Sequence, residues 1–252
     1  MLRSMRDLKN TRIEATDGDI GHVEEFYFDD EKWAVRYMIV DTAAWIFGRK
    51  VLISPYSVES LDWNDRVRVN LTKDQIKESP DVDTTAPISR VYEREHNRYY
   101  AIPHYWGGTG MWGGEAYPAP APVGVDLGRE TTEAEVSAAE NTHLRSSKEV
   151  TGYTIRATDD SIGTVDDFMI EEESWAIRYL VVDTGTVFSG RKVLISPRWV
   201  ESIDWTGSDV FVTLSKAEIE NSPEYDPSKP VERSYEESLH GHYGRESYWD
   251  RR

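Results

Sequence analysis

Residues 35–55 read VRYMIVDTAAWIFGRKVLISP, and residues 177–197 repeat them as IRYLVVDTGTVFSGRKVLISP. Each copy opens with a run that is apolar on both faces of an extended chain, which is typical of a strand covered on both sides. Each copy ends on KVLISP, a second apolar run that stops at a proline because proline cannot donate to a strand ladder. The stretch therefore predicts two strands joined by a short loop, and it predicts them twice.

The repeat extends far beyond these strands. An offset of 142 residues aligns residues 13–63 with residues 155–205, and one inserted residue near Gly207 makes the offset 143 afterwards. The triplet Leu-Arg-Ser at residues 2–4 recurs at residues 144–146. Solenoid repeats are about 20–50 residues long, so this longer period indicates a doubled domain. The polar tail after the last strand also recurs, and its matched residues in the first copy are Asp83, Pro87, Arg90, Tyr92, Glu93, Tyr100, Tyr105 and Trp106.

The chain is expected to have three parts. Repeat 1 with its tail covers residues 1–106 around a barrel core at about 8–80. Repeat 2 with its tail covers residues 143–252 around a barrel core at about 150–223. Residues 107–142 between them are rich in Gly, Pro and Ala, a composition typical of a flexible linker.

Each repeat is predicted to be mainly β. Apolar and polar side chains alternate in VRVNL, residues 67–71, as they do in a half-buried strand. Capping boxes at Thr72 with Gln75 and at Ser215 with Glu218 predict a short helix after the last strand of each copy. About five or six short strands in ~80 residues favour a small β-barrel, because closure removes exposed strand edges. The expected fold is two small β-barrels, each followed by a short helix and a Tyr/Trp-rich tail.

Three motifs of the chain resemble the PRC-barrel family: GDIGHV at residues 18–23, the Arg-Tyr…Val-Asp-Thr strand, and KVLISP. That family includes the cytoplasmic barrel of the photosynthetic reaction-centre H subunit and the C-terminal domain of a ribosome-maturation factor. The resemblance covers both barrel cores and is greatest to a tandem, stand-alone type that looks like the H-subunit barrel. In the second copy Asp160 replaces Gly18, a change that a turn accepts. The resemblance implies a binding or regulatory module, although fold alone does not imply function.

The composition bears on whether the chain binds nucleic acid or a membrane. The chain has no cysteine, and 29 Lys and Arg against 46 Asp and Glu give a net charge of -17. This charge repels phosphate backbones, so direct nucleic-acid binding is not expected. No apolar run approaches the ~20 residues that a membrane helix needs, and charges interrupt the N-terminus where a signal peptide is apolar. We expect a cytoplasmic protein, with peripheral contact to the inner membrane through a partner left open.

No catalytic constellation stands out. A nucleophile, a base and an orienting residue do not recur as a set, and no phosphate-loop, zinc-protease or dinucleotide motif occurs. The pair His240 and His242 offers only two ligands, so we interpret it as solvated tail rather than as a metal site. The sequence therefore predicts no enzyme activity, no metal site and no cofactor.

Charged residues recur in the same places of both copies. The acidic clusters could hold a cation or relay protons, but we favour solvated hairpin turns that keep strand edges from associating. Their members are Glu24, Glu25, Asp29, Asp30 and Glu31, with Asp166, Asp167, Glu171, Glu172 and Glu173. Arg36 and Arg178 interrupt an apolar strand, and a buried arginine must find a partner, so we predict a structural ion pair in each barrel. The duplicated candidates for that partner are Asp41 and Asp183, or Asp62 and Asp204.

The two copies differ most in the loop between the paired strands. One loop carries Trp45, Ile46 and Phe47, and the other carries Val187 and Phe188. These bulky side chains are expected either to pack on the sister barrel, which we favour, or to bind another protein. The leading hypothesis is a non-enzymatic tandem barrel that acts as a binding, scaffold or regulatory module through protein contacts, its halves packed as a pseudo-dimer. The alternative is an H-subunit-like accessory to photosynthetic or respiratory electron transfer at a membrane surface.

Overall fold

The computed structural model describes residues 1–42, 49–62, 65–83, 87–106, 108–119, 143–185 and 190–250. The chain divides into two compact units. The repeat-1 unit consists of Asp7–Ser147 and Glu173–Ala176. The repeat-2 unit consists of Met1–Arg6, Lys148–Glu172 and Ile177–Arg252. Each unit is therefore built mainly from one repeat, with a short piece of sequence from the other.

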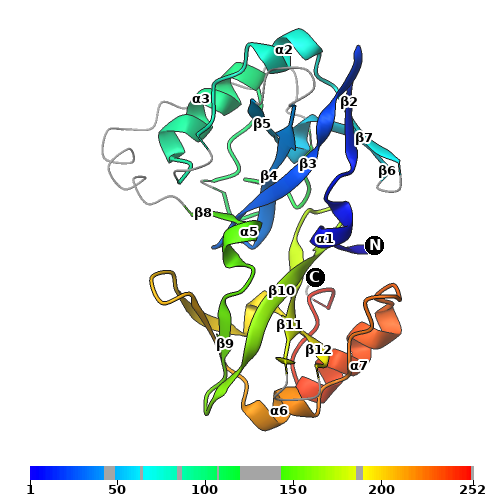
Figure 1. Cartoon of the computed structure of the whole chain (residues 1–252), viewed down its shortest axis with the longest axis vertical. Helices are drawn as coiled ribbons and strands as arrows, with labels where there is room; N and C mark the ends of the chain where they lie inside the picture. The colour runs from blue at the N-terminus through cyan, green and yellow to red at the C-terminus, as the bar shows by residue number, and fades with distance from the viewer. Residues whose placement is uncertain are drawn as a thin grey trace. The chain divides into compact units, whose positions relative to one another are not determined.

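The repeat-1 unit contains a seven-stranded sheet (Figure 1). Six strands follow the order β5-β4-β3-β2-β7-β6, and β8 pairs with β3. The β2 and β7 strands are parallel, and the other pairs are antiparallel. The strands are β2 (Arg12–Ala15), β3 (Gly18–Asp29), β4 (Ala34–Asp41), β5 (Lys50–Ile53), β6 (Val58–Asp62), β7 (Arg66–Val69) and β8 (Leu144–Ser146).

The repeat-2 unit has the same sheet topology. Its six strands follow the order β12-β11-β10-β9-β14-β13, and β1 pairs with β10. The strands are β1 (Leu2–Ser4), β9 (Thr154–Arg156), β10 (Ser161–Glu171), β11 (Ile177–Asp183), β12 (Lys192–Ile195), β13 (Val200–Asp204) and β14 (Asp209–Val212). The prediction of a mainly β chain with two β domains is confirmed.

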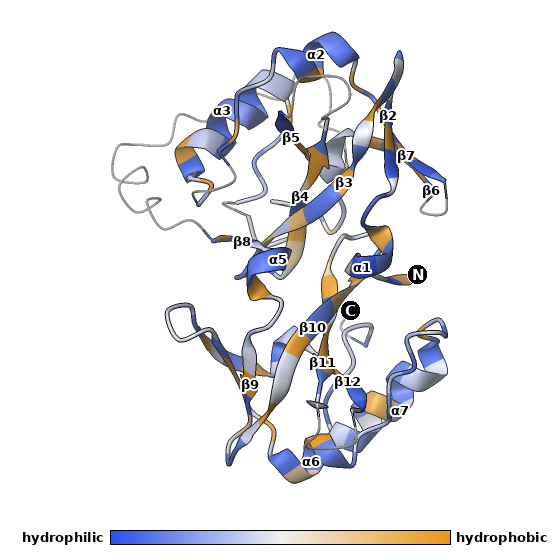
Figure 2. Ribbon diagram, viewed as in Figure 1, coloured by the Kyte–Doolittle hydropathy of each residue, from blue (hydrophilic) through white to orange (hydrophobic). Residues whose placement is uncertain are grey.

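The first strand of the repeated stretch at residues 35–55, β4, is buried on both faces. Every residue of β4 except Asp41 is buried, as the apolar pattern predicts. In Figure 2 this strand is largely orange, whereas the outer helices α2 and α3 are largely blue. Side chains from distant parts of the sequence meet on it in a core cluster of Tyr27, Tyr37, Ile39, Leu52, Ile88 and Leu144.

One glycine of the GDIGHV motif is required by a close approach of two strands. Gly21 has φ +145°, and a Cβ there would lie 2.0 Å from the carbonyl oxygen of Asp41. Gly163 repeats this geometry, with 2.1 Å to the carbonyl oxygen of Asp183. A side chain at Gly18 would meet nothing nearer than 3.6 Å. This difference explains why the second glycine recurs in repeat 2 and the first does not.

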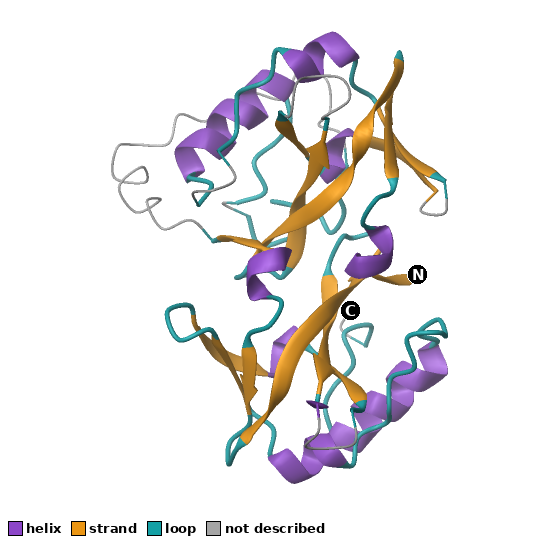
Figure 3. Cartoon of the chain, viewed as in Figure 1, coloured by secondary structure: helices purple, strands orange, loops and turns teal. Residues whose placement is uncertain are grey.

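A short helix follows the last strand of each repeat, and a longer helix lies in each tail; Figure 3 shows the helices in purple. The helices α2 (Lys73–Lys77) and α6 (Lys216–Glu220) begin at the two predicted capping boxes, which are both formed. The tails contain longer helices, α3 (Arg90–Tyr100) and α7 (Arg233–Tyr243). The remaining short elements are α1 (Met5–Leu8), α5 (Ser147–Val150) and the 3-10 turns η1 (Pro55–Ser57) and η3 (Pro197–Trp199).

The boundaries of the two units do not coincide with the boundaries of the repeats. The β1 strand comes from the start of repeat 1 but pairs with β10 of the repeat-2 unit. The β8 strand comes from the start of repeat 2 but pairs with β3 of the repeat-1 unit. Each sheet is thus completed by the Leu-Arg-Ser triplet of the other repeat.

Part of the segment predicted as linker packs into the repeat-1 unit. Residues 110–115 form two isolated bridges, Gly110 with Gly113 and Trp112 with Glu115. Trp112 is buried, and its indole Nε1 donates to the Ser174 carbonyl at 2.8 Å. A composition rich in glycine therefore does not keep this part of the segment away from the folded unit, because one tryptophan supplies enough apolar surface to anchor it.

Candidate functional site

Arg36 is a completely buried charge in the repeat-1 unit. Its Nη2 pairs with Asp29 Oδ2 at 3.0 Å, and the side chains are 0% and 4% exposed. In the repeat-2 unit Arg178 pairs with Glu171, the residue equivalent to Asp29. Each of the two strand arginines therefore has an ion-pair partner in its own unit.

The structure pairs these arginines with acids other than Asp41 and Asp183. Asp41 lies five residues after Arg36 on the same strand, which places it on the opposite face and roughly 16 Å along the strand. Asp183 has the same relation to Arg178. The acid that does pair lies at the end of the preceding strand, where β3 and β4 approach their connecting turn. Strand register across the hairpin, rather than closeness in sequence, selects the partner.

Aromatic rings cover the guanidinium of Arg36. Its Cζ lies 4.0 Å from the ring centroid of Tyr105 and 4.6 Å from that of Trp112. The Cζ of Arg90 lies 5.2 Å from the ring centroid of Tyr105 and 4.2 Å from that of Trp106. The five side chains alternate as ring and cation, and we call them the ladder. Stacking explains how Arg36 is tolerated in the core although its Nε and Nη1 lack hydrogen-bond partners.

A buried carboxyl group lies beside the ladder. Glu93 is fully buried, and Arg90 Nη1 lies 3.0 Å from its Oε2. Its Oε1 accepts hydrogen bonds from the hydroxyl groups of Tyr105 at 2.6 Å and Tyr37 at 3.3 Å. Burial raises the pKa of Glu93 to about 7, although Arg90 and the two hydroxyl groups favour the charged form. The group can therefore exchange a proton near neutral pH.

The repeat-2 unit builds a similar cluster from the equivalent residues. Arg178 stacks on Tyr248 at 4.1 Å, and Arg233 stacks on Trp249 at 3.9 Å. Glu236 accepts hydrogen bonds from Tyr248 at 2.9 Å and from Tyr179 at 3.0 Å, and burial raises its pKa. The cluster is more open, because the Arg233 side chain is 48% exposed whereas that of Arg90 is 9% exposed.

These clusters explain the repetition of the tail. The matched tail residues Arg90, Glu93, Tyr105 and Trp106 contact one another, and Tyr105 stacks on the strand arginine Arg36, so their repetition reports a shared core. Sequence comparison of the two copies found these residues but not what they contact. The interpretation of His240 as solvated was wrong: it is buried, its Nε2 lies 3.0 Å from the Tyr179 hydroxyl, and burial lowers its pKa. His242 is exposed, as expected.

The acidic clusters hold the two exchanged strands. We call residues 1–6 the first arm and residues 143–147 the second arm. In the repeat-2 unit, Asp167 accepts from the Ser4 hydroxyl and Glu172 accepts from Arg3 Nε at 2.8 Å. In the repeat-1 unit, the contacts are the same: Glu25 accepts from the Ser146 hydroxyl at 2.7 Å, and Asp30 accepts from Arg145 Nε at 2.8 Å.

Glu24 and Asp166 also have cationic partners inside their own unit. Glu24 pairs with Lys50 at 2.7 Å, and Asp166 pairs with Lys192 at 2.5 Å and with Arg6 of the first arm at 2.7 Å. A bulge in each long strand separates each of these acids from its acidic neighbour, so that the two face different partners. Solvated turns therefore describe these clusters poorly, since Glu25, Asp29 and Asp167 are buried.

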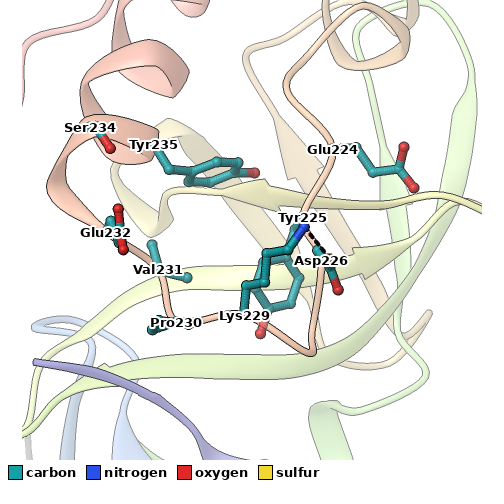
Figure 4. Close-up of a pocket in the computed structure, with 9 residues that line it drawn as sticks. All are labelled: Glu224, Tyr225, Asp226, Lys229, Pro230, Val231, Glu232, Ser234 and Tyr235. Atoms are coloured by element: carbon teal, nitrogen blue, oxygen red, sulfur yellow. Dashed lines mark ion pairs between the residues drawn. The ribbon is translucent and has the colours of Figure 1, made fainter.

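A cavity of about 420 Å³ lies in the repeat-2 unit between the loop after α6 and the start of α7 (Figure 4). Lys229 and Asp226 form an ion pair at 2.9 Å beside it. In the repeat-1 unit Ile88, the residue equivalent to Val231, is buried in the core cluster. The residues that line the cavity are Glu224, Tyr225, Asp226, Lys229, Pro230, Val231, Glu232, Ser234 and Tyr235. They include none of the predicted site residues and no nucleophile with a base in contact.

Several predictions fall outside these sites. Trp45, Ile46, Phe47, Val187 and Phe188 lie outside the described residues. Within the described ranges, His, Asp and Glu side chains do not gather in a group of three or more that could hold a metal ion. No helix in that part of the chain is long and apolar enough to span a membrane.

Comparison with known proteins identifies the second repeat. Residues 144–219 match the PRC-barrel domain. An uncharacterized protein of Deinococcus radiodurans is 34% identical over 96 residues, which cover 36% of this chain and 34% of that protein. The chain thus spans about a third of the length of this relative. The matched domain runs from the second arm through α6, which includes all the strands of repeat 2. The chain therefore contains a PRC-barrel domain at residues 144–219.

Proposed function

We propose that the chain is a non-enzymatic tandem PRC-barrel module that binds another protein and acts as a scaffold or regulator. On this proposal each seven-stranded sheet is one barrel, and the two barrels present different loops to a partner. One observation supports it most. The strand arginines, the tail arginines and their acids, which both repeats share, are engaged inside their own units in ion pairs, ladders and arm contacts.

We infer from this engagement that the shared residues serve the fold rather than a catalytic reaction. Glu93 could exchange a proton, but it is fully buried and is enclosed by Arg90, Tyr37 and Tyr105. A catalytic base must reach its substrate, directly or through one water. Arg49 and Arg191 are also shared, and they donate to the last carbonyls of α2 and α6 and the residues that follow. Function is then expected where the copies differ in sequence.

The largest such difference is the loop pair of residues 43–48 and 185–190. Trp45, Ile46 and Phe47 in one copy, against Val187 and Phe188 in the other, give each repeat its own set of apolar side chains at this place in the sequence. Aromatic and large aliphatic side chains dominate the binding energy of protein interfaces. We therefore assign the partner contact to these loops, with the first loop dominant.

The test is affinity capture with tagged full-length chain at about 10 µM in lysate of the source organism. Substitution of Trp45, Ile46 and Phe47 by serine is expected to lower recovery of a discrete partner at least tenfold, because loss of a single hot-spot residue costs about 2 kcal/mol or more and about 1.4 kcal/mol is a tenfold change in affinity. The matched control replaces Val187 and Phe188 by serine. A partner recovered equally by both variants and the parent would refute the loop assignment. A partner that cofractionates with pigment or quinone membranes would favour the electron-transfer alternative.

A further inference from the structure

The two arm sites recognise the same tripeptide with the same chemistry. In each site a Leu-Arg-Ser strand adds antiparallel to the end of the unit's longest strand, β10 or β3. The leucine is buried, and Leu144 belongs to the core cluster of its unit. Main-chain pairing supplies affinity in this mode of recognition, and alternate side chains supply specificity.

Each polar side chain of the triplet has its own carboxylate. Arginine donates to Asp30 or Glu172, both at 2.8 Å, and serine donates to Glu25 or Asp167. The two sites also share a backbone hydrogen bond. The carbonyl of the residue before the leucine accepts from the amide of the acidic residue that binds the arginine. These contacts are His143 O with Asp30 N at 2.9 Å and Met1 O with Glu172 N at 3.0 Å.

The contacts do not depend on which chain delivers the arm. Arg3 bonds to Glu172, Ser4 bonds to Asp167, and Arg6 bonds to Asp166 and Asp167, which all belong to the repeat-2 unit. The repeat-2 unit therefore obtains its seventh strand from a segment that continues into the repeat-1 unit at Asp7. An identical segment from another molecule would make the same bonds, which is the condition for exchange of an element between copies.

We propose that the β10 arm site also accepts the first arm of a second copy of this chain, so that the protein forms arm-exchanged dimers. This inference rests on the proposed scaffold function and names one partner for it. The closed chain and the dimer contain the same contacts, so their balance depends on the effective concentration of the tethered arm. For a short tether that concentration is about 1 mM. About half of the chains are then in dimers at a total concentration of 1 mM, and roughly 2% at 10 µM.

The exchange can be followed with engineered cysteines, because the chain has none. Ser4 and Met169 are opposite each other in the β1–β10 pairing. Full-length Ser4→Cys and Met169→Cys chains are mixed at 1 mM total, incubated and oxidised. We expect a covalent heterodimer, and at least a tenfold smaller yield from a mixture at 10 µM. The control replaces Met169→Cys with Phe211→Cys, a partly exposed position of the same unit outside the arm site, which reports random collision.

Light scattering of the unmodified chain provides the second measurement. Its weight-average mass should rise about 1.5-fold between 10 µM and 1 mM, in line with half of the chains in dimers. A chain carrying both Ser4→Cys and Met169→Cys, oxidised at 10 µM so that its arm is locked in its own unit, should not rise. A constant mass for the unmodified chain overturns the inference. An equal rise in the mass of the locked chain would also overturn it. So would a heterodimer yield from the Ser4→Cys and Met169→Cys mixture that is no greater than the yield from the mixture with Phe211→Cys. Partner capture by the loops is measured at 10 µM, where monomer predominates, so the two proposals fail separately.

Discussion

Replacement of Glu93 by glutamine should remove a pH dependence from the stability of the repeat-1 unit. Burial raises the pKa of Glu93 from its ordinary 4.5 to about 7. Between these values the folded unit binds the proton more tightly than the unfolded chain does, so the free energy of unfolding falls as pH rises. A shift of this size corresponds to about 3 kcal/mol, most of which is lost between pH 5 and pH 8. Glutamine resembles the protonated acid and cannot ionise.

The assay is hydrogen exchange by mass spectrometry on the full chain, read on peptides from α3, at several urea concentrations at pH 5 and pH 8. The parent should lose roughly 2–3 kcal/mol of opening free energy over this range relative to Glu93→Gln. His96 acts in the opposite direction, because burial lowers its pKa, and comparing the two chains cancels its contribution. Glu236→Gln is the matched control, and it should alter α7 peptides while leaving α3 peptides unchanged. Equal pH dependence of α3 in the parent and Glu93→Gln would refute the reasoning.

Three further substitutions test the architecture of the repeat-1 unit by chemical denaturation. Trp112→Ala should lower the free energy of unfolding by about 3–5 kcal/mol, because it removes a buried indole that stacks on Arg36. The control Tyr117→Ala, at a residue that is 52% exposed, should lower it by less than about 0.5 kcal/mol. Arg36→Met should cost about 3–5 kcal/mol by leaving Asp29 buried without its cation, and unchanged stability would contradict the ion-pair assignment. Gly21→Ala should cost more than about 2 kcal/mol, and clearly more than Gly18→Ala, because only the first places a methyl group against backbone; equal costs would show that φ alone matters.

The β elements and helix starts were predictable because their signals are local. Alternation in VRVNL, apolar residues on both faces of β4, and the two capping boxes each describe a single segment and its immediate neighbours. The need of Arg36 for a partner was also predictable, because burial of a charge has the same cost in any fold. The residues that contact Arg36 were not predictable. Asp29 is placed beside it by the register of the hairpin, and Trp112 stacks on it from a segment about 75 residues further along the chain.

Comparison of the two copies predicted which tail residues matter but not what they contact. Arg90, Glu93 and Tyr105 recur, and repetition alone does not distinguish a core residue from a residue that binds a partner. Their contacts with one another, and the stacking of Tyr105 on Arg36, depend on how α3 lies against the sheet, which no periodicity within the tail encodes. The acidic clusters were misread for the same reason, since the arms that they hold come from the other end of a repeat.

By itself the sequence determined that the chain contains two β-rich copies of one unit, each beginning with Leu-Arg-Ser and each needing a partner for one buried arginine. Only the tertiary structure decided which sheet each Leu-Arg-Ser strand completes. The physical reason is that both arms are the same tripeptide and both sites offer one carboxylate to the arginine and one to the serine. This local chemistry alone does not select one pairing, so the choice depends on how the connected chain folds in three dimensions.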